Sequence, residues 1–299
     1  MLKSLVQKYR HYKYLLLILP GVIVWFVLAI YPNLEVFPLS LYRWNGISQT
    51  KTYVGLQNFN TITSDPNLRK GFINTILYVL FLFVIQSVIA VLLSVILREN
   101  TTHNKFFRTL FFLPLVFSSV MVGLTWGYMY DPNLGVLNQL LVKLGLQDFN
   151  GFNWLGEPVR AILCIVLVHI WANIGYPITI ITAGLQTIPE TLYEAADVEG
   201  TNALQSFIYV TFPLLLPTLL RITLLTIITG AMAFDYVFLM GSTTGVASPF
   251  DTWSVYIYKG LQGQNLGLPA ASGVLLGIIL FIIFMIQYTV TRKVEDSVN

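Results

Sequence analysis

Long apolar stretches alternate with polar connections along this chain, and their length determines the fold class that the sequence predicts. Six stretches run near Tyr14 to Tyr31, Phe72 to Leu97, Thr109 to Tyr130, Ala161 to Gly184, Leu214 to Met240 and Ala271 to Val290. Each is long enough to cross about 30 Å of hydrocarbon, because a helix rises about 1.5 Å per residue. No strand-like alternation competes with them. The sequence therefore predicts an all-α, polytopic membrane protein with six transmembrane helices.

The composition indicates that lipid is the main solvent of this chain. Of its 299 residues, 56% are hydrophobic and 10% are charged, and the mean hydropathy is +0.71; about a quarter of a soluble domain is charged. The net charge of +3 comes from scattered Lys and Arg, so no nucleic-acid partner is expected. The single cysteine, Cys164, lies in an apolar stretch and cannot form a disulfide within one chain. The first stretch exceeds the hydrophobic region of a signal peptide, about 7 to 15 residues, so we expect it to be retained as a span.

Positive charges are concentrated in three of the polar segments. Nine cations lie in the amino-terminal tail, the connection between the second and third stretches, and the carboxyl-terminal tail: Lys3, Lys8, Arg10, Lys13, Arg98, Lys105, Arg108, Arg292 and Lys293. The connections on the other side are much longer and hold fewer: Arg43, Lys51, Arg69, Lys70, Lys143, Arg160 and Lys259. Because Lys and Arg accumulate on the cytoplasmic side, both termini are predicted to be cytoplasmic, as an even number of spans requires.

The connection from Leu185 to Pro213 departs from this charge rule. By parity it is cytoplasmic, yet it contains no Lys or Arg and four acids, which are Glu190, Glu194, Asp197 and Glu199. A segment of this composition avoids lipid headgroups, which indicates that it contacts another protein.

Helix start and stop signals divide this connection into two short helices. Thr187 and Glu190 have the spacing of a capping box, so a helix is expected to begin there. Gly200 is placed to end it, since glycine accepts the left-handed conformation of a helix terminus. Thr201 is then expected to cap a second short helix before the fifth span.

The spacing of residues in this connection resembles a known motif. The residues concerned are Glu194, Ala195, Ala196, Gly200, Phe207, Pro213 and Pro217. They are similar to the EAA loop of binding-protein-dependent ABC importers, which forms a coupling helix docked into the ATP-binding subunit. Glu199 departs from the family pattern, which usually has Asp before the glycine, but the charge is kept. The resemblance implies that the coupling residues are Glu194, Ala195, Ala196, Glu199, Gly200, Phe207 and Pro213.

Shorter segments extend the resemblance over nearly the whole chain from about Tyr53. They are Gly55-Leu56-Gln57-Asn58-Phe59, Asn74-Thr75, Trp126 with Tyr130 to Asn133, Gly135 and Asn138, and Trp171 with Gly175-Tyr176-Pro177. In order and spacing they are similar to carbohydrate-importer permeases, above all the first membrane subunit of the maltose-type group. The resemblance implies the ABC type I importer permease fold in a prokaryotic plasma membrane. Residues 1–71 would form the tail, first span and outer loop, residues 72–290 the permease core with coupling loop 185–213, and residues 291–299 a cytoplasmic tail.

The resemblance also implies the partners. A second homologous permease would complete the path, two ATP-binding cassette subunits would bind ATP and Mg, and an extracytoplasmic solute-binding protein would deliver a sugar. This chain is expected to bind no cofactor and no metal. It has no Gly-x-x-x-x-Gly-Lys-[Ser/Thr] loop to hold ATP phosphates and no His-Glu-x-x-His or Gly-x-Ser-x-Gly motif, so an enzyme is not expected. The alternative is an ion-coupled secondary transporter of a polar solute, but such a protein usually has paired intramembrane carboxylates, and only Asp235 is available.

Polar and aromatic side chains of the fourth and fifth stretches are candidates for the solute path, because a sugar needs hydrogen bonds and stacking surfaces. His169, Asn173 and Tyr176 share one helical stripe. Gly175 and Pro177 can open the backbone toward a cavity. His169 itself is interpreted as an interhelical hydrogen-bond partner, because no second His or carboxylate accompanies it on its helix.

On the fifth stretch Thr229, Ala233 and Tyr236 share a face, and Asp235 lies beside it. Asp235 faces either a cavity or the outer surface, and both readings stay open. In the maltose-type relatives, residues at the positions of Asn173 to Ile178 and Thr229 to Tyr236 hold the sugar. The resemblance thus gives the predicted path residues as Trp171, Asn173, Gly175, Tyr176, Ile178, Thr229, Ala233, Asp235 and Tyr236.

Overall fold

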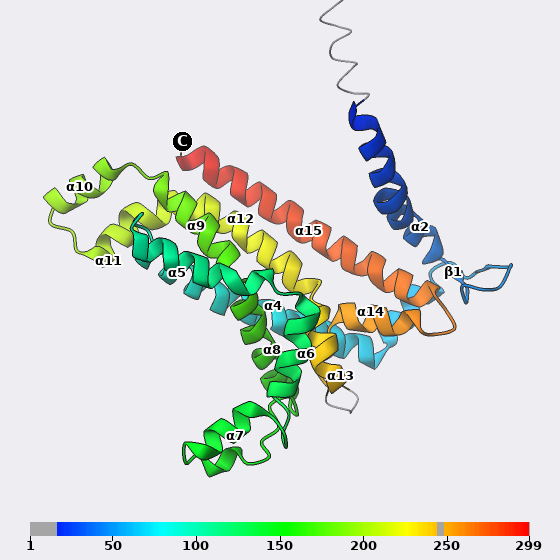
Figure 1. Ribbon diagram of the computed structural model, residues 1–299. Helices are drawn as coiled ribbons and strands as arrows, with labels where there is room; N and C mark the ends of the chain where they lie inside the picture. Colours follow the sequence, from blue (N-terminus) through cyan, green and yellow to red (C-terminus); the bar gives the residue numbers. More distant parts are fainter. Residues whose placement is uncertain (1–16, 244–247, 299) are drawn as a thin grey trace, which may run out of the picture. The chain divides into compact units, whose positions relative to one another are not determined.

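The computed structural model describes residues 17–243 and 248–298, which are mostly helical (Figure 1). The chain divides into two compact units. One comprises residues up to 65 together with 257–277, and the other comprises residues 66–256 together with those from 278 onward. The amino-terminal cations and the first three residues of the predicted first span lie outside the described residues.

Four helices are individually long and apolar enough to cross a membrane: Leu17–Leu39, Pro66–Ile96, Ala203–Ser242 and Gly267–Val294. Two further candidates are bent pairs. Thr102–Val116 and Ser119–Met129 meet at 91°, and Pro158–Asn173 and Gly175–Gln186 meet at 55°. The described residues therefore contain four to six candidate spans, in agreement with an all-α membrane protein, but the third and fourth are not the continuous helices that the sequence predicts.

The first unit contains the first long helix and a small polar cap. The helix includes the π-turn η1 (Phe26–Ile30) and α2 (Tyr31–Leu39), and it continues past the predicted end at Tyr31. Pro32 directly follows the π-turn, where the regular hydrogen-bond ladder of the helix is already interrupted. The cap consists of α3 (Gln57–Ser64) and an antiparallel pair of two-residue strands, β1 (Tyr42–Arg43) and β2 (Thr52–Tyr53), in which Tyr42 lies opposite Tyr53.

Asn58 holds this cap together. Its side-chain amide is buried and donates to the carbonyl oxygens of Ser40 (2.8 Å) and Tyr42 (2.9 Å), and its Oδ1 accepts from Asn265 (3.2 Å). A Cβ at Gly267 would overlap the Tyr42 carbonyl oxygen, so the chain can approach this closely only at a glycine. The Gly-Leu-Gln-Asn-Phe segment therefore has a structural role in this unit.

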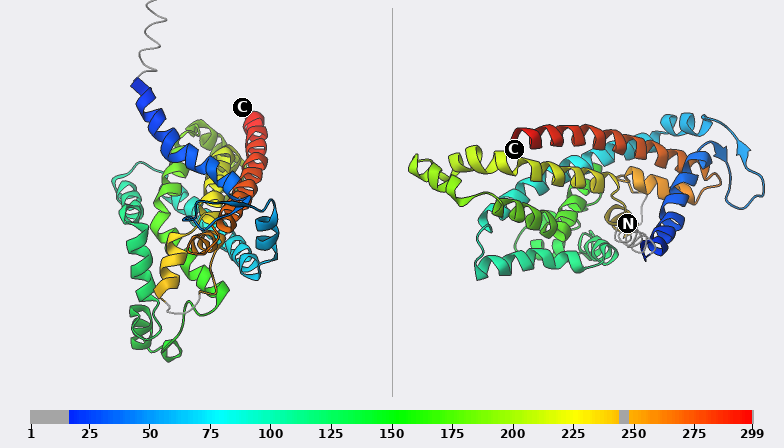
Figure 2. Two further views of the ribbon diagram at one scale, coloured as in Figure 1. Left: turned by 90° about the vertical axis from the view of Figure 1, so that its right-hand side faces the viewer. Right: turned by 90° about the horizontal axis from the view of Figure 1, so that it is seen from above.

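In the second unit, α4 (Pro66–Ile96) packs against α8 (Pro158–Asn173), α9 (Gly175–Gln186) and α12 (Phe212–Ala231). The remaining elements are α5 (Thr102–Phe112), η2 (Leu113–Val116), α6 (Ser119–Met129), α7 (Val136–Lys143), η3 (Gln147–Phe149), α10 (Glu190–Val198), α11 (Ala203–Ser206), η4 (Phe207–Thr211) and α13 (Asp235–Thr243). Two helices, α14 (Trp253–Leu261) and α15 (Gly267–Val298), contribute to both units. Figures 1 and 2 place α10, α11 and the carboxyl end of α15 toward the same end of the second unit.

Each bend in the second unit has a local cause. Pro114 lies in η2, and Phe117 and Ser118 after it are extended, so the apolar run that the sequence predicts as one span is broken there. The 55° bend between α8 and α9 lies at Gly175, where the sequence predicts that the backbone opens. A Cβ on Gly175 would lie 2.5 Å from the Cα of Phe112 in α5, so only glycine permits this close approach of two backbones.

Candidate functional site

The acidic connection forms two helices joined by a sharp turn, as predicted. The first helix, α10, begins at Glu190 after Pro189, without a side-chain cap. The predicted capping box is wrong, because the Thr187 hydroxyl donates to the Gly184 carbonyl oxygen (2.7 Å) and so belongs to the end of α9.

Gly200 ends α10 as predicted. Its φ is +76°, and the Thr201 amide and hydroxyl both donate to the Ala196 carbonyl oxygen, at 3.1 and 3.0 Å. Since the Thr201 hydroxyl is used there, the second helix is capped one residue later than predicted. Asn202 and Gln205 form a reciprocal capping box with two contacts of 2.9 Å.

The second helix does not end before the fifth span. After α11 the chain passes through the π-turn η4 directly into α12. Pro213 lies in the first turn of α12, and Pro217 lies inside it. The hairpin is therefore connected to α12 by continuous helical backbone, so a displacement of the hairpin can move α12.

The predicted coupling residues face in different directions. Glu194, Ala195, Glu199 and Pro213 are exposed, and Phe207 is half-buried. Ala196 is 7% exposed and packs against the chain's own body, so Ala195 is the alanine left available to a partner. Val198, which is 87% exposed, adds an apolar side chain to the free surface of α10.

A polar network joins three helices of the predicted solute path. The Tyr78 hydroxyl lies 2.8 Å from His169 Nδ1, and this confirms His169 as an interhelical hydrogen-bond partner. Asn173 donates to the His169 carbonyl oxygen (2.9 Å) and to the Tyr236 hydroxyl (3.2 Å). The His169 and Tyr236 rings lie 5.2 Å apart. The network therefore fixes Asn173 and Tyr236, both half-buried, against α4.

The other predicted path residues divide by exposure. Trp171, Tyr176, Thr229 and Asp235 are exposed. Asp235 accepts a short hydrogen bond of 2.5 Å from Ser119 at the start of α6, a length typical of a hydroxyl bound to a carboxylate. Gly175, Ile178 and Ala233 are buried within the chain, so they have the least surface to offer a solute.

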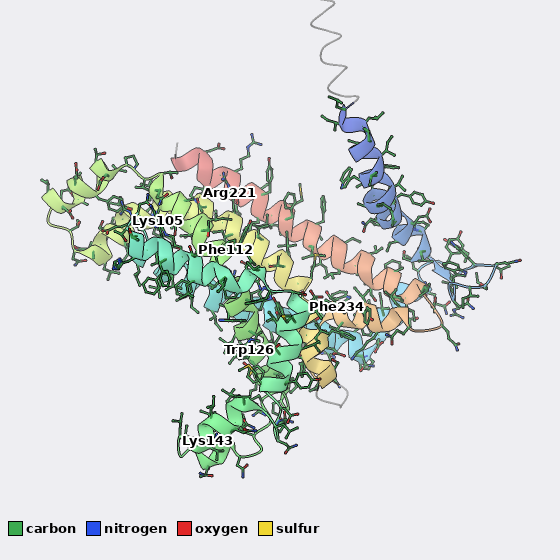
Figure 3. All side chains as sticks on the ribbon, in the orientation of Figure 1. Lys105, Phe112, Trp126, Lys143, Arg221 and Phe234 are labelled. Atoms are coloured by element: carbon green, nitrogen blue, oxygen red, sulfur yellow. The ribbon has the colours of Figure 1, made fainter. Side chains whose placement is uncertain are left out.

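Trp171 extends an aromatic series. Its ring lies 5.7 Å from Trp126 on α6, which is labelled in Figure 3, and Trp126 lies 5.6 Å from Tyr130. Tyr130 in turn lies 6.0 Å from Trp154. The Trp126–Trp171 pair packs edge to face and the other two pairs are tilted. The exposed part of Trp171 is left as the surface available for stacking.

Sequence reasoning missed Tyr78 and Ser119. Tyr78 is fully buried and is 91 residues from His169, and Ser119 is 116 residues from Asp235. No local spacing marks either residue, because their partners lie on other helices.

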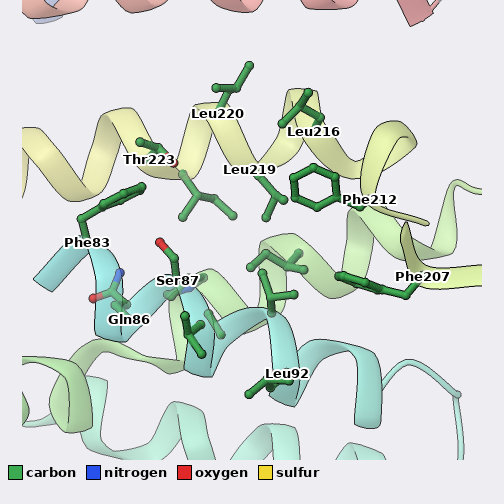
Figure 4. Close-up of a pocket in the computed structure, with 16 residues that line it drawn as sticks. Phe83, Gln86, Ser87, Leu92, Phe207, Phe212, Leu216, Leu219, Leu220 and Thr223 are labelled. Carbon is green, nitrogen blue, oxygen red and sulfur yellow. The ribbon is translucent and has the colours of Figure 1, made fainter. Parts of the chain in front are cut away.

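An apolar cavity of about 510 Å³ lies between α4, α9 and α12 (Figure 4). Its polar lining is limited to Gln86, Ser87 and Thr223. A sugar there would leave most of its hydroxyls without partners, so this cavity is not the solute path. Among the described residues, no three His, Cys, Asp or Glu side chains lie close enough together to hold a metal ion.

A set of four to six apolar helices, an exposed acidic hairpin at one end and a polar network between helices define a membrane permease subunit. The family described as binding-protein-dependent transport system inner membrane component matches residues 86–294, and the chain belongs to this family. The EAA loop is a feature of the family, and the ion-coupled alternative is not favoured.

Individual relatives match most of the chain. The "Probable ABC transporter permease protein YurN" of Bacillus subtilis (strain 168) is 32% identical over 238 residues, which are 78% of this chain and 80% of YurN. The "Arabinooligosaccharides transport system permease protein AraP" of Halalkalibacterium halodurans is 31% identical and covers 92% of this chain and 86% of its own. The "Trehalose/maltose transport system permease protein MalF" of Thermococcus litoralis is 30% identical and covers 94% of both chains.

A solved structure has the same fold. A chain in the crystal structure of a bacterial alginate ABC transporter, in complex with an alginate pentasaccharide-bound periplasmic protein, superposes with a TM-score of 0.81. The two chains are 22% identical, and the match covers 96% of this chain and 97% of the other.

Proposed function

We propose that this chain is one of two permease subunits of an ATP-driven importer for a sugar or oligosaccharide. The observation that carries the proposal is the free surface of α10, on which Glu194, Ala195 and Glu199 are exposed. Acids beside a large exposed apolar side chain, Val198, suit a protein partner better than lipid headgroups. The partner is a cytoplasmic ATP-binding cassette subunit that binds ATP and Mg, and this chain binds no cofactor itself.

The proposed topology has six spans with both termini in the cytoplasm. Counting each bent pair as one span supports the number six. The carboxyl end of α15 points toward the end of the second unit that carries α10 (Figures 1 and 2). Lys105, at that end, and Lys143, on α7 at the other, are labelled in Figure 3. Lys105, and Arg98 through its contact with Tyr193, lie at the end that carries α10. This supports a cytoplasmic assignment of that end, because Lys and Arg accumulate on the cytoplasmic side.

A sugar or oligosaccharide is the proposed solute. Two observations support it: the path combines hydrogen-bonding side chains, Asn173 and Tyr236, with exposed aromatic surface on Trp171 and Tyr176, and relatives are named for arabinooligosaccharides and for trehalose and maltose. Other relatives are named for sn-glycerol-3-phosphate, so glycerol phosphate belongs in any panel of test solutes.

The transport cycle follows from these parts. An extracytoplasmic binding protein delivers the sugar to the segments Asn33 to Gly71 and Gly241 to Ala270, which include short helices as well as loops; residues 244–247 of the second segment lie outside the described residues. A second homologous permease completes the path. Two ATPase subunits close on ATP and displace the α10–α11 hairpins, and the paired permeases change from inward-facing to outward-facing. Hydrolysis reverses the change.

The experiment is reconstitution of the co-expressed complex in liposomes. ATPase activity is measured with binding protein loaded from a panel of arabinooligosaccharides, trehalose, maltose, glycerol-3-phosphate and diacetylchitobiose, for which a further relative is named. One sugar is expected to stimulate it. Glu194→Lys is expected to abolish uptake while the permease stays in the membrane, because it reverses the charge of the exposed face of α10. Asp148→Lys, an equal charge reversal on exposed η3, is the control and should retain uptake.

Two results would contradict the proposal. One is uptake by the purified permease alone, driven by an ion gradient. The other is the absence of any crosslink between residues 194–200 and an ATP-binding subunit during uptake.

A further inference from the structure

Arg98 connects the carboxyl end of α4 to the middle of α10. Its guanidinium carbon lies 3.9 Å from the centroid of the Tyr193 ring, over the ring face. Both side chains are half-buried, so water only partly screens the attraction between the cation and the ring. The two residues are 95 positions apart in the sequence, so the contact is not part of a local helix cap.

Tyr193 carries the connection further, to the start of the fifth span. Its hydroxyl lies 3.0 Å from the Thr211 hydroxyl, which is buried at the end of η4. Since η4 continues directly into α12, this one tyrosine contacts both α4 and the helix that leads into α12.

Arg108 of α5 fixes the backbone on the other side of Arg98. Its Nε and Nη2 donate to the Leu97 carbonyl oxygen, and Nη2 also donates to the carbonyl oxygens of Arg98 and Glu99, at 3.0 Å each. These are carbonyls at a helix end that lack intrahelical partners. Arg98 is therefore held through its backbone to α5 and through its side chain to α10.

Little else attaches α10 to the rest of the second unit. Within α10 only Ala196 is buried, and Glu190, Leu192 and Glu194 are exposed. A force applied to α10 by a partner therefore reaches the other helices mainly through Ala196, through Tyr193 and through the covalent turn at Gly200.

We propose that the Arg98–Tyr193 contact transmits the displacement of α10 to α4 and α5, and that Arg98 is a positioning residue for energy coupling. The inference rests on the proposed function and adds a residue outside the EAA loop. From α5 the chain continues through η2 and the extended residues Phe117 and Ser118 to Ser119, which binds Asp235 beside the predicted solute path. A movement at Arg98 therefore has a short covalent connection to that path. A planar guanidinium can slide over a ring without losing contact, which suits a joint that must move.

The test uses the full reconstituted complex, with the sugar from the panel above that stimulates ATPase most. Arg98→Ala and Tyr193→Leu are each expected to lower binding-protein-stimulated ATPase and uptake by roughly five- to tenfold, with membrane level and co-purification of the ATPase unchanged. Tyr193→Phe keeps the ring and should restore most of the activity. Arg98→Lys keeps a cation but not the planar group, so it should restore only part of it. Lys105→Ala and Tyr209→Leu remove an exposed cation on α5 and an exposed tyrosine on η4, and these controls should change nothing.

A second readout needs no solute. Cys164 is buried and is the single native thiol, so a cysteine placed at Tyr128, which is 68% exposed on α6, can be labelled selectively. A non-hydrolysable ATP analogue is expected to change the rate of maleimide labelling of Tyr128→Cys. Adding Arg98→Ala should reduce that change. In the Arg98→Ala background Tyr193→Leu should reduce it by less than it does alone, because part of its effect is loss of the same contact.

The outcomes distinguish a coupling role of Arg98 from a purely structural one. Full coupling in Arg98→Ala overturns the inference. Loss of assembly or of melting temperature in Arg98→Ala, in place of loss of coupling, shows a purely structural role and also overturns it. If the unsubstituted complex shows no stimulated ATPase, the proposed function itself fails, and this is seen before any variant is compared.

Discussion

The α10–α11 hairpin and the predicted solute path are organised in opposite ways. The hairpin is built from contacts a few residues apart, such as Thr201 with Ala196 and Asn202 with Gln205. The path is built from contacts between helices far apart in the chain, such as Tyr78 with His169. The hairpin that is proposed to bind another protein is thus specified by local contacts, whereas the predicted path is specified by the packing of several helices.

Two glycines show the same difference between a local and a long-range requirement. Gly200 ends α10 at a φ of +76°, and a Cβ there would meet nothing within 4 Å. Gly175 lies between α8 and α9, where a Cβ would lie 2.5 Å from the Cα of Phe112. The first glycine is required by its own backbone conformation, and the second by another helix.

The largest effect is expected at Gly175. Gly175→Leu should prevent α5 and α9 from packing, because the obstructing atoms belong to backbone and cannot rotate away. The expected cost exceeds the 1–3 kcal/mol, roughly, of ordinary overpacking, and the measurement is the level of folded complex recovered from membranes. Gly273→Ala is the control, since a Cβ there meets nothing within 4 Å. A normal yield of Gly175→Leu would show that the bend is not fixed by this approach.

A smaller loss is expected at Tyr78. Tyr78→Phe leaves His169 Nδ1 without its partner in the interior, which should cost about 1–3 kcal/mol. The melting temperature of the purified complex measures the loss. Tyr128→Phe removes an exposed hydroxyl and should leave the melting temperature unchanged. Equal melting temperatures for both variants would mean that the network does not hold α4 and α8 together.

The difference between local and long-range contacts explains which features the sequence predicted correctly. The apolar stretches predicted the helical fold and the positions of the candidate spans, because lipid-crossing length is a property of the local sequence. Gly200 and the two-helix hairpin were predicted for the same reason. The caps were misplaced because Thr187, Thr201 and Asn202 are all competent caps, and tertiary and turn contacts decide which hydroxyl is free.

The bends were harder to predict. Gly175 signalled an opening, and the helix bends by 55° there, but Thr109 to Tyr130 was predicted as one span and its 91° bend was missed. A proline in an apolar stretch does not by itself mark a break, since membrane helices tolerate it. The roles of the predicted coupling and path residues stay predictions. For the path, the structure adds that Asn173 and Tyr236 are positioned from α4 through Tyr78 and His169, which no motif in the sequence marks.

Substitution of Gly200, which is required only by its backbone conformation, should destabilise the complex less than substitution of Gly175. Gly200→Ala forces a Cβ into the left-handed region, which costs about 1–2 kcal/mol, but it meets no neighbouring atom. We expect the complex to assemble, with a slightly lower melting temperature and reduced stimulated ATPase. Gly200→Asn should be milder still, since asparagine tolerates this conformation. A loss of assembly as severe as that of Gly175→Leu would remove the distinction between the two glycines.

The smallest effect on stability is expected at the Ser119–Asp235 pair, a single exposed hydrogen bond beside the predicted path. Because Asp235 is exposed, water can replace the Ser119 hydroxyl, and Ser119→Ala should cost only about 0.5 kcal/mol. Asp235→Asn should likewise leave the melting temperature unchanged. If the carboxylate lies on the solute path, however, Asp235→Asn should raise the concentration of sugar-loaded binding protein at half-maximal ATPase by about two- to tenfold, the equivalent of one hydrogen bond. An unchanged half-maximal concentration would remove Asp235 from the path and leave it as an outer-surface acid.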